Sequence, residues 1–144
     1  MANTTFEEVI EKTGTLVYTN VGDSMYPLIR RDGDLIVIKQ CNRPLKKYDV
    51  PLYKRDSGQY VLHRIMRVKN GKYVMCGDNR RHLEKGIEDR HIIGVLSSVI
   101  RNGKEIKMDS KKQRLYAHLW CDFFIIRAVI ILIKDIFRII IKGR

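Results

Sequence analysis

The chain has 144 residues, 44% hydrophobic and 31% charged, which predicts one folded domain with a short appendage. Lys and Arg number 28 against 16 Asp and Glu, a net charge of +12, and this excess indicates an anionic partner such as lipid headgroups or nucleic acid. The three cysteines are widely spaced and the four histidines show no ligand spacing, so we expect no disulfide framework, metal site or cofactor.

Residues 1–14 predict a short amphipathic helix. Thr4 is the expected N-cap, Glu7 would complete a capping box with it, and Gly14 is a natural C-terminal stop. Charged residues interrupt this segment, so it has the pattern of neither a signal peptide nor a membrane anchor.

The sequence from Thr15 to residue 108 predicts strands. Turn dipeptides separate apolar or alternating runs, and Asn70-Gly71 and Asn102-Gly103 are typical of type I′ hairpins. The expected strands are 15–18, 34–39, 50–54, 60–68, 72–76, 95–101 and 105–108. Residues 1–108 are therefore predicted to form a compact, mainly β domain with antiparallel pairing.

Residues 109–144 predict a long, basic, amphipathic C-terminal helix between Ser110 and Gly143. Lysines and arginines, Arg127 among them, gather on one side, with aliphatic residues on the other. The longest apolar run, 128–133, is too short to span a bilayer but suits a helix lying in a membrane interface with its cations towards the headgroups. Packing on the domain or on a second copy remains the alternative, so oligomerisation stays open.

Two residues suggest nucleophilic catalysis. Ser24 follows a β-prone run, with Met25 and Pro27 just after it, and His63 lies within a second β-prone run. A serine hydroxyl becomes a good nucleophile when a base such as histidine takes its proton. Period-2 alternation places His63 on the same side as Val61 and Ile65, which suits a partly desolvated base.

Four sequence blocks in order carry a family resemblance. They are S-M-Y-P at 24–27, D-G-D-L-I-V-I at 32–38, V-L-H-R-I at 61–65 and C-G-D-N at 76–79. Together they resemble the catalytic blocks of type I signal peptidases and, more distantly, the self-cleaving repressor proteases. Histidine at position 63 is similar to the endoplasmic-reticulum and archaeal type, in which histidine replaces a lysine base; Lys54 and Lys69 do not fall in the matching block.

The resemblance implies a role for each matching residue. Ser24 would be the nucleophile and His63 the general base, while Asp78 and Glu84 remain equal candidates for the supporting carboxylate, with Asp89 a remote third. The backbone N–H of Ser24 would form most of the oxyanion hole, because Gly22 stands where bacterial signal peptidases often have a serine. The expected supporting positions are Gly22, Met25, Pro27, Arg64 and Asn79.

We therefore expect a serine endopeptidase that cleaves a signal or leader peptide after small residues, at the cytoplasmic face of a membrane, with the basic helix bound peripherally to anionic lipid. The alternative is a non-catalytic regulatory or binding module on the same fold, with a basic surface for lipid or nucleic acid. A nucleic-acid partner is not expected, because the basic residues lack interleaved aromatic residues or a recognised motif.

Overall fold

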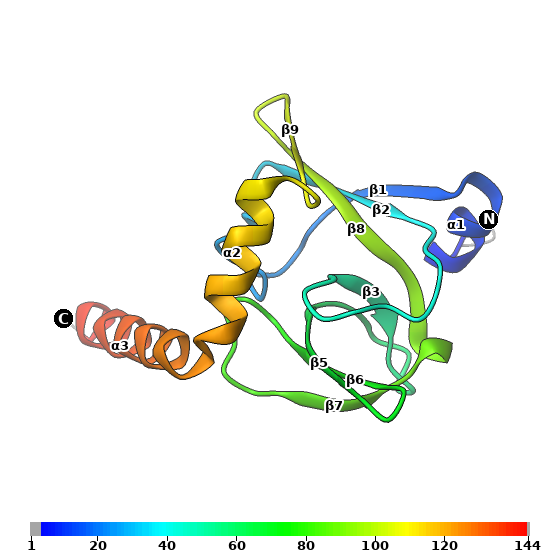
Figure 1. The fold of residues 1–144 in the computed structure, drawn as a ribbon. Coiled ribbons are helices and arrows are strands. Elements are labelled where there is room, and N and C mark those ends of the chain that lie inside the picture. The colour runs from blue at the N-terminus through cyan, green and yellow to red at the C-terminus, as the bar shows by residue number, and fades with distance from the viewer. Residues whose placement is uncertain (1–3, 144) are drawn as a thin grey trace.

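A computed structural model describes residues 4–143 and confirms the mainly β fold (Figure 1). Residues 1–3 and 144, which belong to the two predicted terminal segments, lie outside the described range. The elements are α1 Phe6–Thr13, β1 Thr15–Thr19, β2 Asp34–Lys39, β3 Pro51–Lys54, β4 Tyr60–Leu62, β5 Arg64–Lys69, β6 Lys72–Cys76, β7 Glu84–Ile87, a 3-10 turn Asp89–His91, β8 Ile92–Arg101, β9 Lys104–Lys107, α2 Lys111–Asp122 and α3 Phe124–Lys142.

The strands form two antiparallel sheets. The larger has the order β1-β2-β8-β3-β4, with β9 paired to β8, and the smaller has the order β5-β6-β7. Register shifts in the β2–β8 and β3–β8 pairings accompany the curl of the larger sheet. The two sheets enclose the hydrophobic core, and α2 crosses beside them before α3 extends away from the β domain (Figure 1).

Local signals in the sequence agree closely with the structure at both hairpins. Asn70 and Gly71 have φ of 51° and 70°, and Asn102 and Gly103 have φ of 50° and 74°. Both pairs therefore adopt the left-handed conformation that a type I′ turn requires, as predicted. The first helix differs by one residue, because Thr5 rather than Thr4 is the N-cap and Glu8 completes the capping box, while Gly14 ends the helix as expected.

The predicted strand 60–68 is interrupted at His63. Leu62 pairs with Leu52 in the larger sheet, whereas Arg64 pairs with Cys76 in the smaller one. His63 thus occupies the point at which the chain passes from one sheet to the other. The apolar periodicity continues through this point, so the sequence alone contains no sign of the break.

The C-terminal region forms two helices rather than one, with Phe123 between them. Ser110 caps α2 by accepting a hydrogen bond from the Gln113 N–H, and Gly143 ends α3. Arg127, expected among the exposed basic residues, is instead buried at 2% exposure. Among residues 4–143, no helix combines the length and the apolar character needed to cross a bilayer.

Candidate active site

Ser24 lies on a series of turns between β1 and β2. The next residue, Met25, is 1% exposed, and its carbonyl oxygen accepts a hydrogen bond from the N–H of Ile29, which is fully buried. Pro27, joined to Tyr26 by a cis peptide bond, completes the turn. Two buried apolar side chains therefore hold the turn in the core, while Ser24 itself remains partly exposed at its surface.

The loop after β6 lies directly against this turn. The N–H of Asn79 donates a hydrogen bond of 2.8 Å to the Ser24 carbonyl oxygen. A side chain at Gly77 would place its Cβ 2.6 Å from that same oxygen and 3.1 Å from Cδ2 of the His63 ring. The Ser24 carbonyl oxygen and the His63 ring therefore both lie against Gly77, and Gly77 allows this close approach because it has no Cβ.

The Ser24 carbonyl oxygen and the His63 ring both lie close to Gly77, but the two side chains are not hydrogen bonded to each other within the described residues. Catalytic contacts are commonly long in enzymes without substrate and shorten when substrate binds. A serine–histidine dyad therefore requires the Ser24 hydroxyl to approach the His63 ring.

The surroundings of His63 keep its imidazole neutral. Burial lowers the pKa of His63 from 6.5 to about 4, although the negative charge of Glu84 opposes this shift. A neutral imidazole has one nitrogen free to accept a proton. At neutral pH, His63 is therefore in the form required of a general base.

Tyr53 connects His63 to a carboxylate. Its hydroxyl donates a hydrogen bond of 2.6 Å to Oε2 of Glu84 and lies 3.4 Å from Nδ1 of His63. Burial, then Glu84, raises the pKa of Tyr53, so this hydroxyl stays protonated. Because its single proton points to Glu84, its contact with Nδ1 is favourable only when Nδ1 carries a hydrogen. This assigns the free lone pair of His63 to Nε2.

Arg55 holds Glu84 in position. Its Nε and Nη2 atoms donate to the two carboxylate oxygens at 2.7 and 2.8 Å. Glu84 lies at the start of β7, Arg55 follows β3, and Tyr53 lies within β3. Neither Tyr53 nor Arg55 is recognisable from the sequence, because only the β3–β4 pairing, with Tyr53 opposite Val61, brings β3 beside His63.

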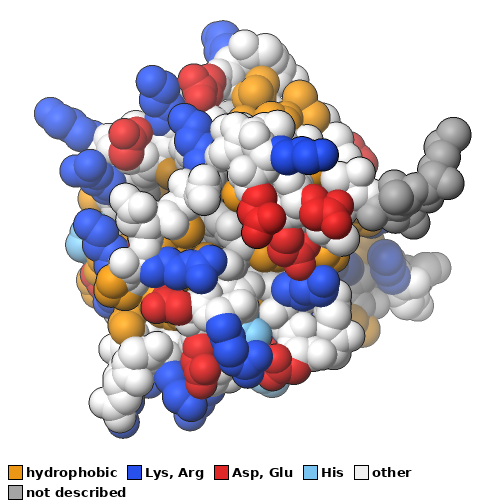
Figure 2. Space-filling model, turned by 90° about the vertical axis from the view of Figure 1, so that its right-hand side faces the viewer, with side chains coloured by type: hydrophobic (Ala, Val, Ile, Leu, Met, Phe, Trp, Pro, Cys, Tyr) orange, Lys and Arg blue, Asp and Glu red, His pale blue; other side chains and the backbone are white. Residues whose placement is uncertain are grey.

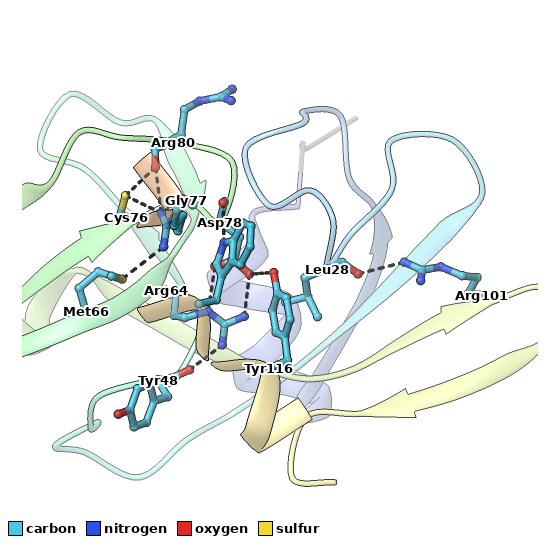
Figure 3. A network of polar contacts seen from close by, with 12 residues as sticks. Leu28, Tyr48, Arg64, Met66, Cys76, Gly77, Asp78, Arg80, Arg101 and Tyr116 are labelled. Atoms are coloured by element: carbon cyan, nitrogen blue, oxygen red, sulfur yellow. Dashed lines mark hydrogen bonds and ion pairs between the residues drawn. The ribbon is translucent and has the colours of Figure 1, made fainter. Parts of the chain in front are cut away.

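Asp78, the other candidate carboxylate, has a different set of partners. It is fully buried, and Arg64 binds both of its oxygens at 2.8 Å (Figure 3). Tyr116 of α2 donates a further hydrogen bond of 3.0 Å to Asp78, and the indole N–H of Trp120 donates to its backbone carbonyl at 2.7 Å. Asp78 therefore joins the C-terminal helices to the loop, whereas Glu84 is the carboxylate linked to His63. Asp89 lies apart and accepts a hydrogen bond from the Tyr73 hydroxyl.

The other predicted supporting residues surround the serine turn. Gly22 accepts a hydrogen bond from the Asn20 side chain, and a Cβ at Gly22 would approach only the Ser24 nitrogen, at 3.9 Å. Asn79 lies 3.4 Å from the carboxylate of Asp23 through its side-chain amide. Arg80 forms a partly exposed ion pair of 2.7 Å with Asp23.

Two further features bear on the chemistry. A cleft of about 660 Å³ between α2, β8 and β9 is lined by neither Ser24 nor His63, so it does not belong to this site. Within the described residues, no group of three or more His, Cys, Asp and Glu side chains is arranged to hold a metal ion.

Comparisons of the chain with protein-family models, curated proteins and solved structures give no match.

Proposed function

We propose that the protein is a serine endopeptidase in which Ser24 is the nucleophile and His63 the general base. The observation that carries the proposal is the position of Gly77, whose missing Cβ leaves room for both the Ser24 backbone and the His63 ring. The neutral imidazole and the Tyr53–Glu84 link support the same assignment. So does the resemblance of the four sequence blocks to type I signal peptidases, which remains a prediction from the sequence.

The proposed reaction proceeds in two stages. Nε2 of His63 takes the hydroxyl proton while Oγ of Ser24 attacks the carbonyl carbon of the scissile peptide bond. The protonated imidazole then gives this proton to the leaving amine, the C–N bond breaks, and an acyl-enzyme remains. Water, deprotonated by His63, hydrolyses the acyl-enzyme and restores both side chains.

Glu84 would act through Tyr53 during this cycle. When His63 becomes protonated, its new positive charge is attracted by the Glu84 carboxylate, which already opposes the lowering of the His63 pKa. The Tyr53 hydroxyl keeps Nδ1 as the protonated nitrogen, so that Nε2 faces the serine. The backbone N–H of Ser24 would stabilise the negative charge of the tetrahedral intermediate.

The resemblance implies a substrate with small residues before the cleaved bond, bound as an extended strand. In the larger sheet, β4 has a paired neighbour on one side only, and it ends immediately before His63. An extended peptide added along this edge would run towards the proposed dyad, with main-chain hydrogen bonds supplying part of its affinity. We propose a signal-type or leader-type peptide as the substrate class.

Covalent labelling tests the dyad directly. A serine-directed fluorophosphonate, followed by intact mass measurement, should add one group to the wild type, none to Ser24→Ala and little to His63→Ala. Lys69→Ala, at the end of β5, is the matched control and should be labelled like the wild type. Absence of an adduct on folded wild type would reject the proposed nucleophile and favour a non-catalytic module.

A further inference from the structure

One side of α3 is an uncovered apolar surface, which we call the apolar face of α3. Eleven large hydrophobic side chains of this helix are exposed; the six most exposed are Ile125, Ile126, Phe137, Ile139, Ile140 and Ile141. At 100° per residue the eleven occupy an arc of about 200° that contains no charged residue. Soluble monomers rarely expose so large a contiguous apolar area, so this face requires a covering partner.

Charged residues of α3 lie on the opposite side, towards the β domain. Lys134 lies 4.5 Å from the centre of the Tyr26 ring, and Asp135 pairs with Arg81 at 3.7 Å. Tyr26 is only two residues after Ser24. The helix therefore runs beside the serine turn and presents its aliphatic residues away from it.

A buried arginine of α3, Arg127, attaches the helix to the loop after β6. Arg127 donates to the carbonyl oxygens of Gly77 and Arg80 at 2.6 and 2.9 Å, and contacts the sulfur atoms of Cys76 and Met66. These four partners surround one guanidinium group in Figure 3. Among residues 4–143, no carboxylate pairs with Arg127, and its Nε has no partner. The guanidinium also faces the rings of Trp120 and Phe124, at 5.8 and 5.2 Å from their centres. Burial of a cation without a carboxylate partner is costly, and these carbonyl, sulfur and ring contacts offset that cost only while the loop holds its position.

The docking site of Arg127 is the loop that forms the proposed active site. Gly77 is the residue against which Ser24 and His63 converge, and Arg80 pairs with Asp23 beside the serine. The apolar face of α3 and the proposed dyad are therefore separated by a single guanidinium group and one loop. A partner that holds α3 in place also holds that loop.

The charge of the chain favours lipid as that partner. Each chain carries +12, so two copies repel one another, while an anionic surface attracts them. An arc of about 200° is much wider than the seam of a two-helix contact, and it suits a helix sunk into the interface of a bilayer. The face turned away from α3 differs, because charges of both signs are mixed there and hydrophobic side chains show only between them (Figure 2).

We propose that α3 binds an anionic lipid interface through its apolar face, and that this binding holds Arg127 against the Gly77–Arg80 loop and so assembles Ser24 and His63. The helix is thus both the membrane contact and the activator of the site. The activation part of this inference rests on the proposed function, whereas lipid binding and ordering of the loop do not.

Flotation of the full chain with vesicles tests the partner. The chain should float with phosphatidylcholine vesicles that contain phosphatidylglycerol, and less with phosphatidylcholine alone. Ile133→Glu, in the middle of the apolar face, should abolish flotation. Val68→Glu, an equally drastic change at an exposed β5 position, should float like the wild type. Failure of the wild type to float, with dimers seen in sedimentation, would overturn the lipid assignment in favour of a second copy.

Hydrogen exchange tests the coupling without any need for activity. The Asn79 amide, which donates to the Ser24 carbonyl, should exchange about tenfold more slowly when anionic vesicles are added. Arg127→Lys keeps the charge, but its side chain is shorter, so its nitrogen cannot reach the position of Nη2, which contacts Gly77, Arg80 and Cys76. This variant should still float with the vesicles, while its Asn79 amide should show no slowing of exchange. Equal slowing in Arg127→Lys, or none in the wild type, would overturn the coupling.

The labelling rate then separates this inference from the proposed function. Anionic vesicles should raise the fluorophosphonate labelling rate of the wild type by about tenfold and leave that of Arg127→Lys unchanged. Lipid-dependent slowing of Asn79 exchange without labelling would reject the peptidase while retaining the lipid-driven ordering. Labelling that is equally fast with and without bound vesicles would retain the peptidase and reject activation by lipid.

Discussion

The hydroxyl oxygen of Tyr53 lies 3.4 Å from Nδ1 of His63, while its proton points to Glu84 at 2.6 Å. The geometry links a carboxylate to the imidazole through a phenol rather than by direct contact. Burial lowers the pKa of His63, and the phenol keeps the Glu84 carboxylate, whose charge opposes this shift, out of direct contact with the ring. This relationship leads to the first prediction.

Tyr53→Phe should lower the fluorophosphonate labelling rate by about tenfold, the usual effect of losing one hydrogen bond. The phenylalanine ring retains the buried packing of Tyr53, so the free energy of unfolding should change much less than the rate. Tyr60→Phe is the matched control, because its hydroxyl bonds to Glu7 on α1 and does not contact His63. Equal rates for Tyr53→Phe and the wild type would exclude a role for the phenol.

The two candidate carboxylates should respond differently to neutralisation. Asp78→Asn leaves the buried Arg64 without its counter-charge, so the free energy of unfolding should fall by about 3 kcal/mol in denaturant titration. Glu84→Gln breaks a partly exposed pair with Arg55, so stability should change by less than about 1 kcal/mol. Its labelling rate should nevertheless fall, because the charge that supports protonated His63 is lost. If Glu84→Gln were the more destabilising change and Asp78→Asn the change that lowered the labelling rate, Asp78 would be the carboxylate that supports His63.

The labelling rate should depend on pH through His63. The base works only when neutral, and burial lowers its pKa to about 4, so the rate should rise as pH increases past about 4 and be level near neutral pH. The measurement is the labelling rate of the wild type between acid and neutral pH, corrected for hydrolysis of the reagent. A midpoint near 6.5 would show that the His63 ring is solvated rather than buried.

The same pKa difference should appear in stability. Between about pH 6.5 and 4 the unfolded chain binds a proton at His63 that the folded chain does not, so the free energy of unfolding should decrease as pH falls through this window. His63→Gln should show a smaller decrease in denaturant titrations over the same range. Parallel pH profiles for the two proteins would contradict the low pKa of the folded state.

Gly77→Ala should disrupt the site while leaving the fold. The added Cβ would lie 2.6 Å from the Ser24 carbonyl oxygen, and because that atom belongs to the backbone, the loop itself must shift. We expect a labelling rate at least about tenfold lower, with far-ultraviolet circular dichroism unchanged. A rate equal to that of the wild type would show that the contact between this loop and the serine turn is not needed.

Much of the local structure follows from short stretches of sequence. Asn70-Gly71 and Asn102-Gly103 specify their hairpins because few other residues tolerate positive φ at both central positions. Ser110 marks the start of α2 because its side chain accepts a hydrogen bond from a backbone N–H three residues later. Gly14 marks the end of α1 because, without a side chain, it adopts the left-handed conformation in which its own N–H bonds to the last turn of the helix. The order of the sequence blocks predicts Ser24 and His63 as a pair, and in the structure the Ser24 carbonyl oxygen and the His63 ring both lie close to Gly77.

Tertiary structure alone decided which side chains support the site. Tyr53 and Arg55 reach His63 and Glu84 through the pairing of β3 with β4. Asp78 meets Arg64 through the pairing of β5 with β6, and Tyr116 through the docking of α2. Arg127 lies on the charged side of an amphipathic helix, which predicts an exposed side chain, yet it is buried against Gly77. Turn and cap preferences act over a few residues and can be recognised from sequence, whereas register and helix docking depend on contacts that exist only after the chain has folded.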